Sequence, residues 1–192
     1  MKKKNTDAQA EPSLPEHFLV LGADLSLNRP GFAVIEYNKG KVDLIRMSCV
    51  DNKSKPNKKP RGHTLTEIAD HFTVLMEDLN KTDLPLYLVR ERAINNASFG
   101  KRSGTAARTG VSEVVGVVDY MAWIYQKQWE ELFPISIKKL ITGNGKADKT
   151  AVAVALKNYI GEHEYQFDDM SDAAAVAVAW LINKGELKTI EN

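Results

Sequence analysis

Three aspartates, Asp168, Asp169 and Asp172, stand directly before an apolar segment rich in alanine and valine, residues 173–182. A helix N-terminus explains one or two acidic residues there, because a carboxylate accepts hydrogen bonds from free backbone N–H groups and suits the positive end of the helix dipole. Capping does not need a third. Carboxylates three or four positions apart lie on one face of a helix, where they repel each other unless a cation lies between them. The spacing therefore indicates a cation site at the start of a helix.

Two more carboxylates each follow an apolar run that is typical of a β-strand. Asp24 ends such a run in residues 17–26, HFLVLGADLS, and Glu91 ends another in residues 84–92, LPLYLVRER. If the two strands are parallel neighbours, both carboxylates lie at the same edge of a sheet. Small side chains along the last helix would let its backbone approach the sheet closely and bring its N-terminal acids to the same place. These small residues are Ala173, Ala174, Ala175, Ala177 and Ala179.

The elements that must hold these carboxylates follow from the apolar periodicity of the chain. Thr64 and Glu67 resemble a capping box at the start of the first helix. The order β-β-β-α-β-α-β-α-α predicts an α/β fold in which a five-stranded mixed sheet is flanked by helices on both faces. Strands are expected in residues 17–26, on both sides of the NKGK turn within 30–50, in 84–92 and in 132–137, and helices in 63–81, 104–129, about 147–160 and after residue 168.

Composition fits one globular domain, because 192 residues with 43% hydrophobic and 27% charged content can enclose one sizeable core. We expect residues 1–16 to be a disordered tail and residues 17–185 to be the domain. The single cysteine, Cys49, cannot form an intramolecular disulfide, which fits a reducing cytoplasm. The longest apolar run is too short to cross a membrane, and the basic N-terminus lacks the apolar region of a signal peptide.

The formal net charge is only +1, but the charges are unevenly distributed. Residues 51–62 form a basic loop with five Lys or Arg against one Asp, and residues 90–108 and 138–149 are also basic. From residue 150 onward, acidic residues outnumber lysines. Any one basic segment is more simply a solvated surface, but three together favour a polyanionic partner.

Four stretches, taken in order, resemble the RuvC family of Holliday junction resolvases within the ribonuclease H-like superfamily. GADLSLNRPGFAVIE resembles the family's first-strand motif, and LVRERA resembles its fourth-strand motif with the glutamate at the strand end. SIKKLITGNGKADKTAV resembles the segment that carries two lysines eleven residues apart, here Lys138 and Lys149. DDMSDAAAVAVAW resembles the closing Asp-x-x-Asp-Ala helix. The combination, rather than any one motif, carries the resemblance.

The chain also departs from the family pattern. Leu25, Ser26 and Leu27 stand where a glycine usually follows the aspartate, and the tail and the basic loop are additional. These departures suggest a divergent member, such as one from a bacteriophage. The family places an aromatic residue shortly after the glutamate to insert at the junction centre. Ile94 stands at the matching position and Phe99 lies five residues later, so both remain candidates.

The resemblance implies a ribonuclease H-like nuclease domain that uses two Mg²⁺ ions, with Mn²⁺ as a substitute, to activate water and stabilise the leaving oxygen. Oxygen ligands without a Cys or His cluster suit magnesium better than zinc. By resemblance, Asp24 bridges both ions, Glu91 and Asp172 each hold one, and Asp169 completes the set, although Asp168 competes with Asp169 for that role. Lys149 and Lys138 would contact phosphate. Further DNA-binding candidates are Arg92, Phe99, Lys101, Arg102 and Arg108.

The implied activity is a magnesium-dependent endonuclease that resolves four-way or otherwise branched DNA by paired symmetric nicks, as a homodimer without membrane attachment. The segment 104–129 is the interface candidate, although its apolar stripe of Val111, Val114, Val115, Val118 and Met121 is equally consistent with intramolecular core. Two alternatives remain open. One is a nuclease of the same fold that cuts RNA or RNA–DNA hybrids, and the other is a non-catalytic protein that binds branched DNA. An ATPase of the same superfamily would need a second domain and phosphate loops that this chain has no room for.

Overall fold

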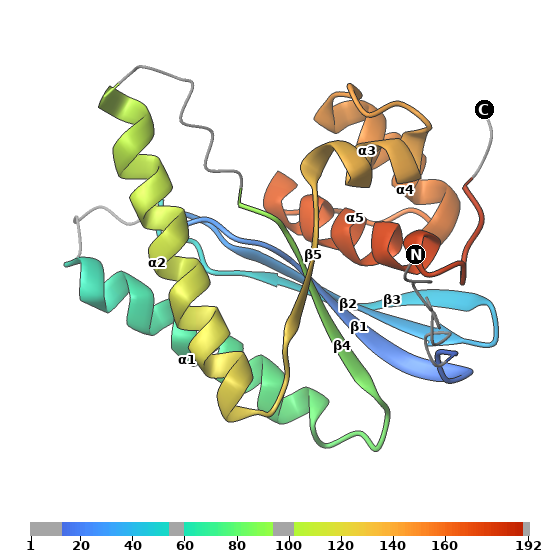
Figure 1. Ribbon diagram of the computed structural model, residues 1–192, viewed down its shortest axis with the longest axis horizontal. Helices are drawn as coiled ribbons and strands as arrows, with labels where there is room; N and C mark the ends of the chain where they lie inside the picture. The colour runs from blue at the N-terminus through green and yellow to red at the C-terminus, as the bar shows by residue number, and fades with distance from the viewer. Residues whose placement is uncertain (1–12, 54–59, 94–101, 190–192) are drawn as a thin grey trace, which may run out of the picture.

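The computed structural model describes residues 13–53, 60–93 and 102–189. Its centre is a five-stranded sheet with the strand order β3-β2-β1-β4-β5 (Figure 1). β1 is antiparallel to β2 and parallel to β4, β2 is antiparallel to β3, and β4 is parallel to β5. The predicted mixed sheet is therefore confirmed. The strands are β1 (His17–Asp24), β2 (Gly31–Asn38), β3 (Lys41–Cys49), β4 (Leu86–Glu91) and β5 (Trp129–Leu132).

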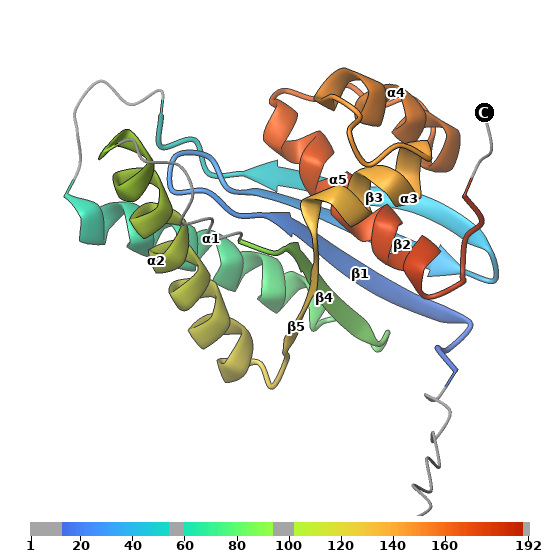
Figure 2. The same ribbon diagram turned by 45° about the horizontal axis from the view of Figure 1, so that its top comes forward.

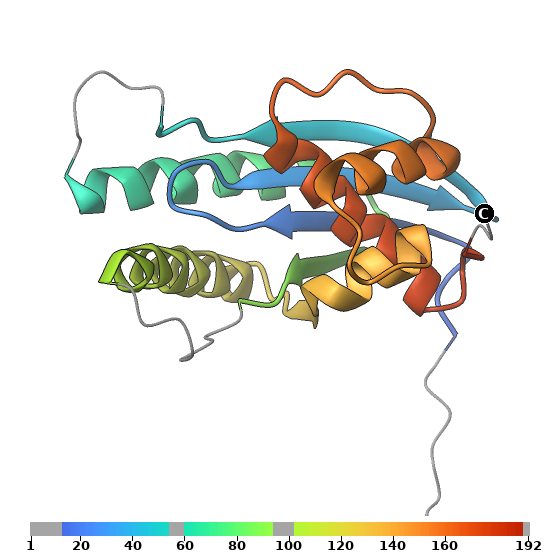
Figure 3. The ribbon, with the colours of Figure 1, turned by 90° about the horizontal axis from the view of Figure 1, so that it is seen from above.

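Helices cover both faces of the sheet, as the sequence predicts. α1 and α2 lie together on one face, and α3, α4 and α5 lie on the other (Figure 3). α5 packs directly on the sheet, and α3 and α4 pack on α5 (Figure 2). The helices are α1 (Arg61–Leu79), α2 (Arg102–Ile124), α3 (Pro134–Thr142), α4 (Lys149–Ile160) and α5 (Asp168–Asn183). Within the described residues, no helix is both long enough and apolar enough to cross a membrane.

The alternation of side chains along β1 divides the core into two layers. Phe18 and Val20 belong to the core on the α5 face, whereas Leu19 and Leu21 belong to the core on the α1 and α2 face. All four side chains are buried because helices cover both faces. The predominantly apolar composition of β1 therefore follows from its central place in the sheet.

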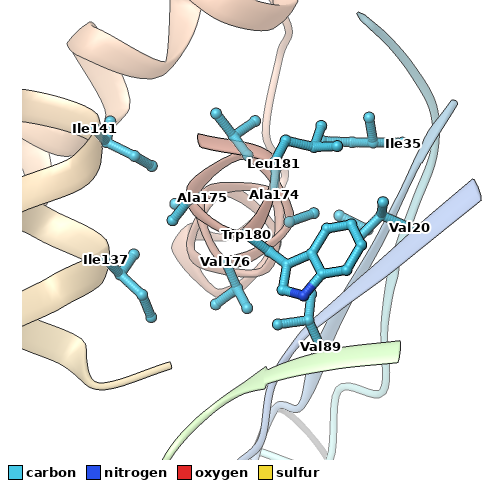
Figure 4. Close-up of a cluster of buried hydrophobic side chains, with 14 of the residues drawn as sticks. Val20, Ile35, Val89, Ile137, Ile141, Ala174, Ala175, Val176, Trp180 and Leu181 are labelled. Atoms are coloured by element: carbon cyan, nitrogen blue, oxygen red, sulfur yellow. The ribbon is translucent and has the colours of Figure 1, made fainter. Parts of the chain in front are cut away.

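The α5 face is built around a buried tryptophan. Trp180 points from α5 toward Val20 and Val89 of the sheet, while Ile137 and Ile141 of α3 approach α5 from its other side (Figure 4). Trp180 is fully buried, as are most residues of α5 after Asp172. This two-sided burial explains why α5 is apolar around most of its circumference.

Two glycines allow α5 to lie close to the strands. A Cβ atom on Gly22 of β1 would lie 2.9 Å from the Cβ atom of Ala177 and would overlap the backbone oxygen of Ala173. A Cβ atom on Gly31, the first residue of β2, would overlap the backbone carbonyl of Asp169. The small residues of α5 are thus met by glycines in the sheet, and the expected close approach is observed.

The expected fifth strand in residues 132–137 is wrong in its position. β5 ends at Leu132, and residues 134–142 form α3, which the sequence prediction missed. Proline is favoured in the first turn of a helix because its missing N–H has no intrahelical partner there, and Gly143 ends α3 with a φ of 74°. Ile137 and Ile141, four residues apart, form the buried side of α3. The apolar alternation of LFPISI resembled a strand, but its proline marked a helix start.

Two further boundaries differ from the expectations. Thr64 does not begin α1, because its N–H already donates to the carbonyl of Pro60, the N-cap residue. α1 therefore starts at Arg61, within the expected basic loop 51–62, of which residues 54–59 lie outside the described residues. α2 ends at Ile124 rather than near residue 129. Residues 1–12 of the expected tail also lie outside the described part of the chain.

Candidate active site

Asp24 and Glu91 end two neighbouring parallel strands. β1 pairs with β4 in a register that places Ala23 opposite Arg90, so the next residue of each strand lies at the same edge of the sheet. Both carboxylates are partly buried. The expected meeting of Asp24 and Glu91 is therefore observed.

The N-terminus of α5 supplies further acidic residues near Asp24 and Glu91. Asp172 lines the same cleft as Asp24 and Glu91, and Asp169 lies close enough to Asp24 to affect its pKa. Asp168 is exposed, and no side chain in the described part of the chain caps α5, whose N-cap residue is Phe167. Capping thus does not explain these aspartates. Of Asp168 and Asp169, only Asp169 contributes to the electrostatics of Asp24.

The cleft between the sheet edge and the three C-terminal helices has a volume of about 370 Å³. Carboxylates lie on its sheet side and at the start of α5, while α3 contributes Lys138 and α4 contributes Lys149. Apolar side chains complete the wall. The lining residues are Asp24, Glu91, Pro134, Ile137, Lys138, Lys149, Val152, Asp172 and Ala175.

The carboxylates perturb one another strongly. Burial, followed by the charges of Glu91, Asp172 and Asp169, raises the pKa of Asp24 to about 7, against an opposing effect of Lys149. Burial and the charge of Asp172 also raise the pKa of Glu91, whereas Lys149 and Lys138 lower it. The cleft therefore holds more negative charge than its two lysines neutralise.

Lys149 is held at the cleft by the start of α4. The Asp148 side chain caps this helix by accepting a hydrogen bond from the N–H of Ala151 at 2.8 Å. Lys149 follows as the first helical residue and forms an ion pair with Asp172. The hydrogen bond from Lys149 to Asp172 is the main reason why the pKa of Lys149 is raised. Lys149 thus neutralises part of the negative charge of the carboxylates.

The donor set fits a hard divalent cation. Carboxylate oxygens surround the cleft, no thiol or imidazole of the described residues lines it, and burial together with the charges of the other carboxylates raises the pKa of Asp24. As they stand, no three Asp, Glu, His or Cys side chains of the described residues meet closely enough to hold a metal ion, and Lys149 lies among the carboxylates. A cation bound here would draw the carboxylates together and compete with Lys149 for Asp172.

The predicted DNA-binding residues are only partly placed. Lys138 faces the cleft, and Arg92 follows Glu91 at the same edge of the sheet. Arg102 and Arg108 belong to α2, but their side chains lie outside the described residues. The same is true of the whole of Ile94, Phe99 and Lys101.

Sequence reasoning missed a buried arginine beneath the site. The Arg90 guanidinium donates hydrogen bonds to Glu131 at 2.8 and 3.0 Å and forms an ion pair with Asp119. These contacts join β4, β5 and α2 directly behind Glu91. A charged residue inside the apolar run LYLVRE was the available signal, because a buried arginine requires partners.

A second arginine links the turn after Asp24 to α5. The guanidinium carbon of Arg29 lies 3.8 Å from the centre of the Phe167 ring, and Arg29 also donates to Asp51 at 3.0 and 3.2 Å. Phe167 immediately precedes Asp168 and Asp169. Nothing in the local sequence around Arg29 indicated this contact, because its partners lie far along the chain.

Comparison with protein families gives one match over most of the chain. The family model described as crossover junction endodeoxyribonuclease RuvC matches residues 20–180. Proteins with that name from Caldicellulosiruptor saccharolyticus and Campylobacter jejuni are 28% and 27% identical to this chain over 171 and 165 residues. The first alignment covers 88% of this chain and 95% of the relative, and the second covers 85% and 96%.

Solved structures show the same fold at lower sequence identity. RuvC of Thermus thermophilus, in complex with a Holliday junction substrate, superposes with a TM-score of 0.72 at 19% identity, covering 91% of this chain and 100% of its own. The yeast mitochondrial Holliday junction resolvase Ydc2 superposes with a TM-score of 0.62 at 18% identity, covering 92% and 82%.

Proposed function

Because the chain belongs to the RuvC family of crossover junction endodeoxyribonucleases, we propose that its carboxylate cleft resolves Holliday junctions and related branched DNA by cutting phosphodiester bonds. One observation carries this proposal. Asp24, Glu91 and Asp172, which come from three remote parts of the sequence, line one cleft together with Lys138 and Lys149. The fold is ribonuclease H-like, and its elements from β1 to α5 support a single nuclease domain over residues 17–185.

Asp24, Glu91, Asp169 and Asp172 would hold Mg²⁺, and Mn²⁺ would substitute for it. When bound, two such ions would supply an activated water and stabilise the leaving oxygen. The pKa of Asp24, raised by burial and by the charges of Glu91, Asp172 and Asp169, supports a role for Asp24 at the centre of the donor set. The position of Asp169 near Asp24 favours it over the exposed Asp168 as the fourth ligand.

The lysines and the apolar wall would act on the DNA. Lys138 and Lys149 neutralise the phosphate that enters the cleft, and Lys149 has its ammonium group beside Asp172. Val152, Ile137 and Ala175 also line the cleft and would give the phosphate a partly apolar surrounding, in which charge–charge attraction is stronger than in water. Arg92, Arg102 and Arg108, together with Phe99 and Lys101, would extend the contact to the arms of the branched DNA.

A homodimer would place two such clefts on one junction. Val114 and Val118 of α2 are buried against α1 and the sheet, so the predicted apolar stripe is largely intramolecular. A different side of α2 is open, because Tyr120, Trp123 and Ile124 are exposed, Trp123 by 68%. A second copy that covers this side would relate the two clefts by a two-fold axis, which matches the symmetry of a four-way junction. The single cysteine supports a reducing, cytoplasmic setting for the dimer.

A substrate panel tests the proposed function. The protein is incubated with four-way junctions, flaps, plain duplex, single strands and RNA–DNA hybrids of one sequence, with Mg²⁺ or with EDTA. We expect rapid cutting of the four-way junction with Mg²⁺ only, and no cutting by Asp24→Asn, Glu91→Gln or Asp172→Asn, all of which should still bind the junction. Preferential cutting of hybrids would support the broader nuclease alternative. Junction binding without any cutting by the wild type would support the non-catalytic alternative.

A further inference from the structure

An exposed phenylalanine directly precedes a residue that lines the cleft. Phe133 connects β5 to α3 as the N-cap residue of α3, and 49% of its surface is exposed. The next residue, Pro134, lines the cleft with Asp24 and Glu91. Phe133 belongs to neither of the two core clusters of buried residues in the described part of the chain. The core therefore does not explain why an aromatic ring is placed here.

Arg92 lies against this ring. Its guanidinium carbon is 4.8 Å from the centre of the Phe133 ring. The backbone N–H of Arg92 donates to the carbonyl of Leu132 at 2.8 Å, which extends the pairing of β4 with β5 and fixes the two side chains next to each other. Arg92 directly follows Glu91, so the cation and the ring are joined by backbone to a cleft carboxylate and to the cleft wall.

Arg92 keeps much of its charge available. Its Nε atom lies 3.7 Å from Glu131, but that carboxylate also accepts two shorter hydrogen bonds from Arg90. The Arg92 side chain is 51% exposed. One carboxylate shared by two arginines neutralises Arg92 only in part, and an exposed cation attracts phosphate.

The Phe133 ring offers an aromatic face, and the partly neutralised Arg92 guanidinium offers positive charge. These two features match the base and the phosphate of one nucleotide. Resting on the proposed function, we propose that Phe133 and Arg92 form a stacking platform for the nucleotide next to the scissile phosphate. The base stacks on the Phe133 ring and the neighbouring phosphate contacts Arg92. Bases in continuous duplex are already stacked on each other, whereas a branch point offers bases with a free face. The platform therefore favours branched DNA over duplex.

The test uses junctions that carry 2-aminopurine at single positions around the branch point and around the mapped cut sites. Binding is measured with Ca²⁺ in place of Mg²⁺ so that the DNA stays intact. We expect wild-type protein to change the fluorescence of 2-aminopurine beside the cut site, Phe133→Ala to lose that change, and Phe133→Trp to keep it. Loss of stacking on the ring should weaken junction affinity by about 5- to 150-fold and leave duplex affinity unchanged.

Matched variants separate the platform from a general effect on folding or on the metal. Ile135→Ala removes a neighbouring exposed apolar side chain of α3 that has no aromatic ring, and it should change junction affinity by less than about twofold. The Mg²⁺ concentration that half-saturates cutting should be the same for Phe133→Ala and wild type, because Phe133 supplies no metal ligand.

Three outcomes would overturn the platform. These are an unchanged fluorescence and affinity of Phe133→Ala, an equal loss of affinity for duplex and junction, or a loss of dimer in sedimentation, which would mean that a second copy covers the ring. A wild type that cuts junctions while Phe133→Ala behaves identically defeats the platform alone. A wild type that cuts no branched DNA defeats the proposed function, and the platform with it.

Discussion

Asp24 is maintained at a cost to the fold. Its pKa lies at about 7, because it is buried among Glu91, Asp172 and Asp169. An acid whose pKa is raised on folding binds its proton more tightly in the folded state than in the unfolded state. The free energy of unfolding therefore falls as the pH rises from about 4 to about 7 and stays low above that range. Such a position is typical of a functional group rather than a structural one.

Asp24→Asn should stabilise the metal-free protein. At about pH 8 with EDTA, we expect the free energy of unfolding to rise by about 1–3 kcal/mol, and the gain should vanish near pH 4, where wild-type Asp24 is protonated when folded. Urea denaturation at both pH values measures the difference. Asp168→Asn changes an exposed aspartate next to Asp169 and should leave the free energy of unfolding unchanged at both pH values. A destabilised Asp24→Asn protein at pH 8 would contradict the inferred cost of burying the Asp24 charge beside the other carboxylates.

Lys149→Ala should shift the pH dependence of cutting as well as its rate. Lys149 lowers the pKa of both Asp24 and Glu91, so its loss should raise both pKa values and move the acidic limb of the pH–rate profile to higher pH. We expect the rate constant for cutting at neutral pH to fall by about 100-fold. Lys146→Ala removes an exposed lysine from the loop before α4 and should leave the profile in place. A reduced rate with an unmoved acidic limb would assign Lys149 to phosphate binding alone.

The cleft acids were predictable from sequence, but several residues beside them were not. Asp24 and Glu91 each end an apolar run, and Asp172 precedes one, whereas the local pattern left Asp168 and Asp169 as alternatives. Contacts such as Arg29 with Phe167, or Phe133 with Arg92, depend on segments far apart in the chain. Their geometry is set by the packing of whole elements, which a local pattern does not encode.

At the scale of elements, α3 was the main error of the sequence prediction and also carries part of the site. Its buried residues Ile137 and Ile141 match a short helix, yet the alternation before them resembled a strand. Lys138 lies between them in sequence and reaches the cleft. The prediction therefore placed Lys138 directly after a strand, whereas it lies inside a helix, because a nine-residue helix offers little periodicity to detect.

Gly31→Ala should damage the site without changing any side chain that lines it. The added methyl group overlaps the carbonyl of Asp169 and must displace the start of α5 or the start of β2. We expect a loss of stability of about 1–3 kcal/mol, as for other overpacked sites. Cutting at saturating DNA should fall at least about tenfold, because small displacements of catalytic groups are costly. Cutting rates over a range of Mg²⁺ concentrations measure the effect, which should include a higher half-saturating concentration.

The matched control is Gly62→Ala in α1, where an added Cβ atom meets nothing within 4 Å. That substitution should leave cutting unchanged and stabilise the helix slightly, since alanine is the better helix former. Wild-type rates and an unchanged Mg²⁺ requirement in Gly31→Ala would show that α5 does not depend on this close approach.

For the whole molecule, the sheet with helices on both faces followed from the order of apolar patterns, and the structure confirms it. The apolar patterns did not predict which residues of α2 lie in the core and which lie on the open surface. Val114 and Val118 are buried while Tyr120 and Trp123 are exposed, and all four belong to one continuous helix. Its periodicity gives an apolar side but cannot assign apolar residues outside that side to a partner.

Trp123→Asp should dissociate the proposed homodimer. A charge placed at the centre of the open side of α2 would have to be buried without a partner, which disfavours association. We expect sedimentation velocity to show a monomer at concentrations where the wild type is a dimer, with unchanged helical content. Val74→Asp places the same charge on another exposed apolar residue, in α1, and should remain dimeric. Wild-type protein that sediments as a monomer would remove the proposed interface.

Paired cutting within one dimer is most directly measured on a supercoiled plasmid that extrudes a cruciform. Release of supercoiling by a first nick removes the cruciform, so linear product requires a second cut within the lifetime of the same complex. With Mg²⁺, wild-type protein should produce mainly linear plasmid. Heterodimers with one Asp172→Asn subunit, purified through two different tags, should stop at the nicked circle. Accumulation of nicked circles by the wild type, or equal cutting of a plasmid without the cruciform, would contradict resolution of junctions by this cleft.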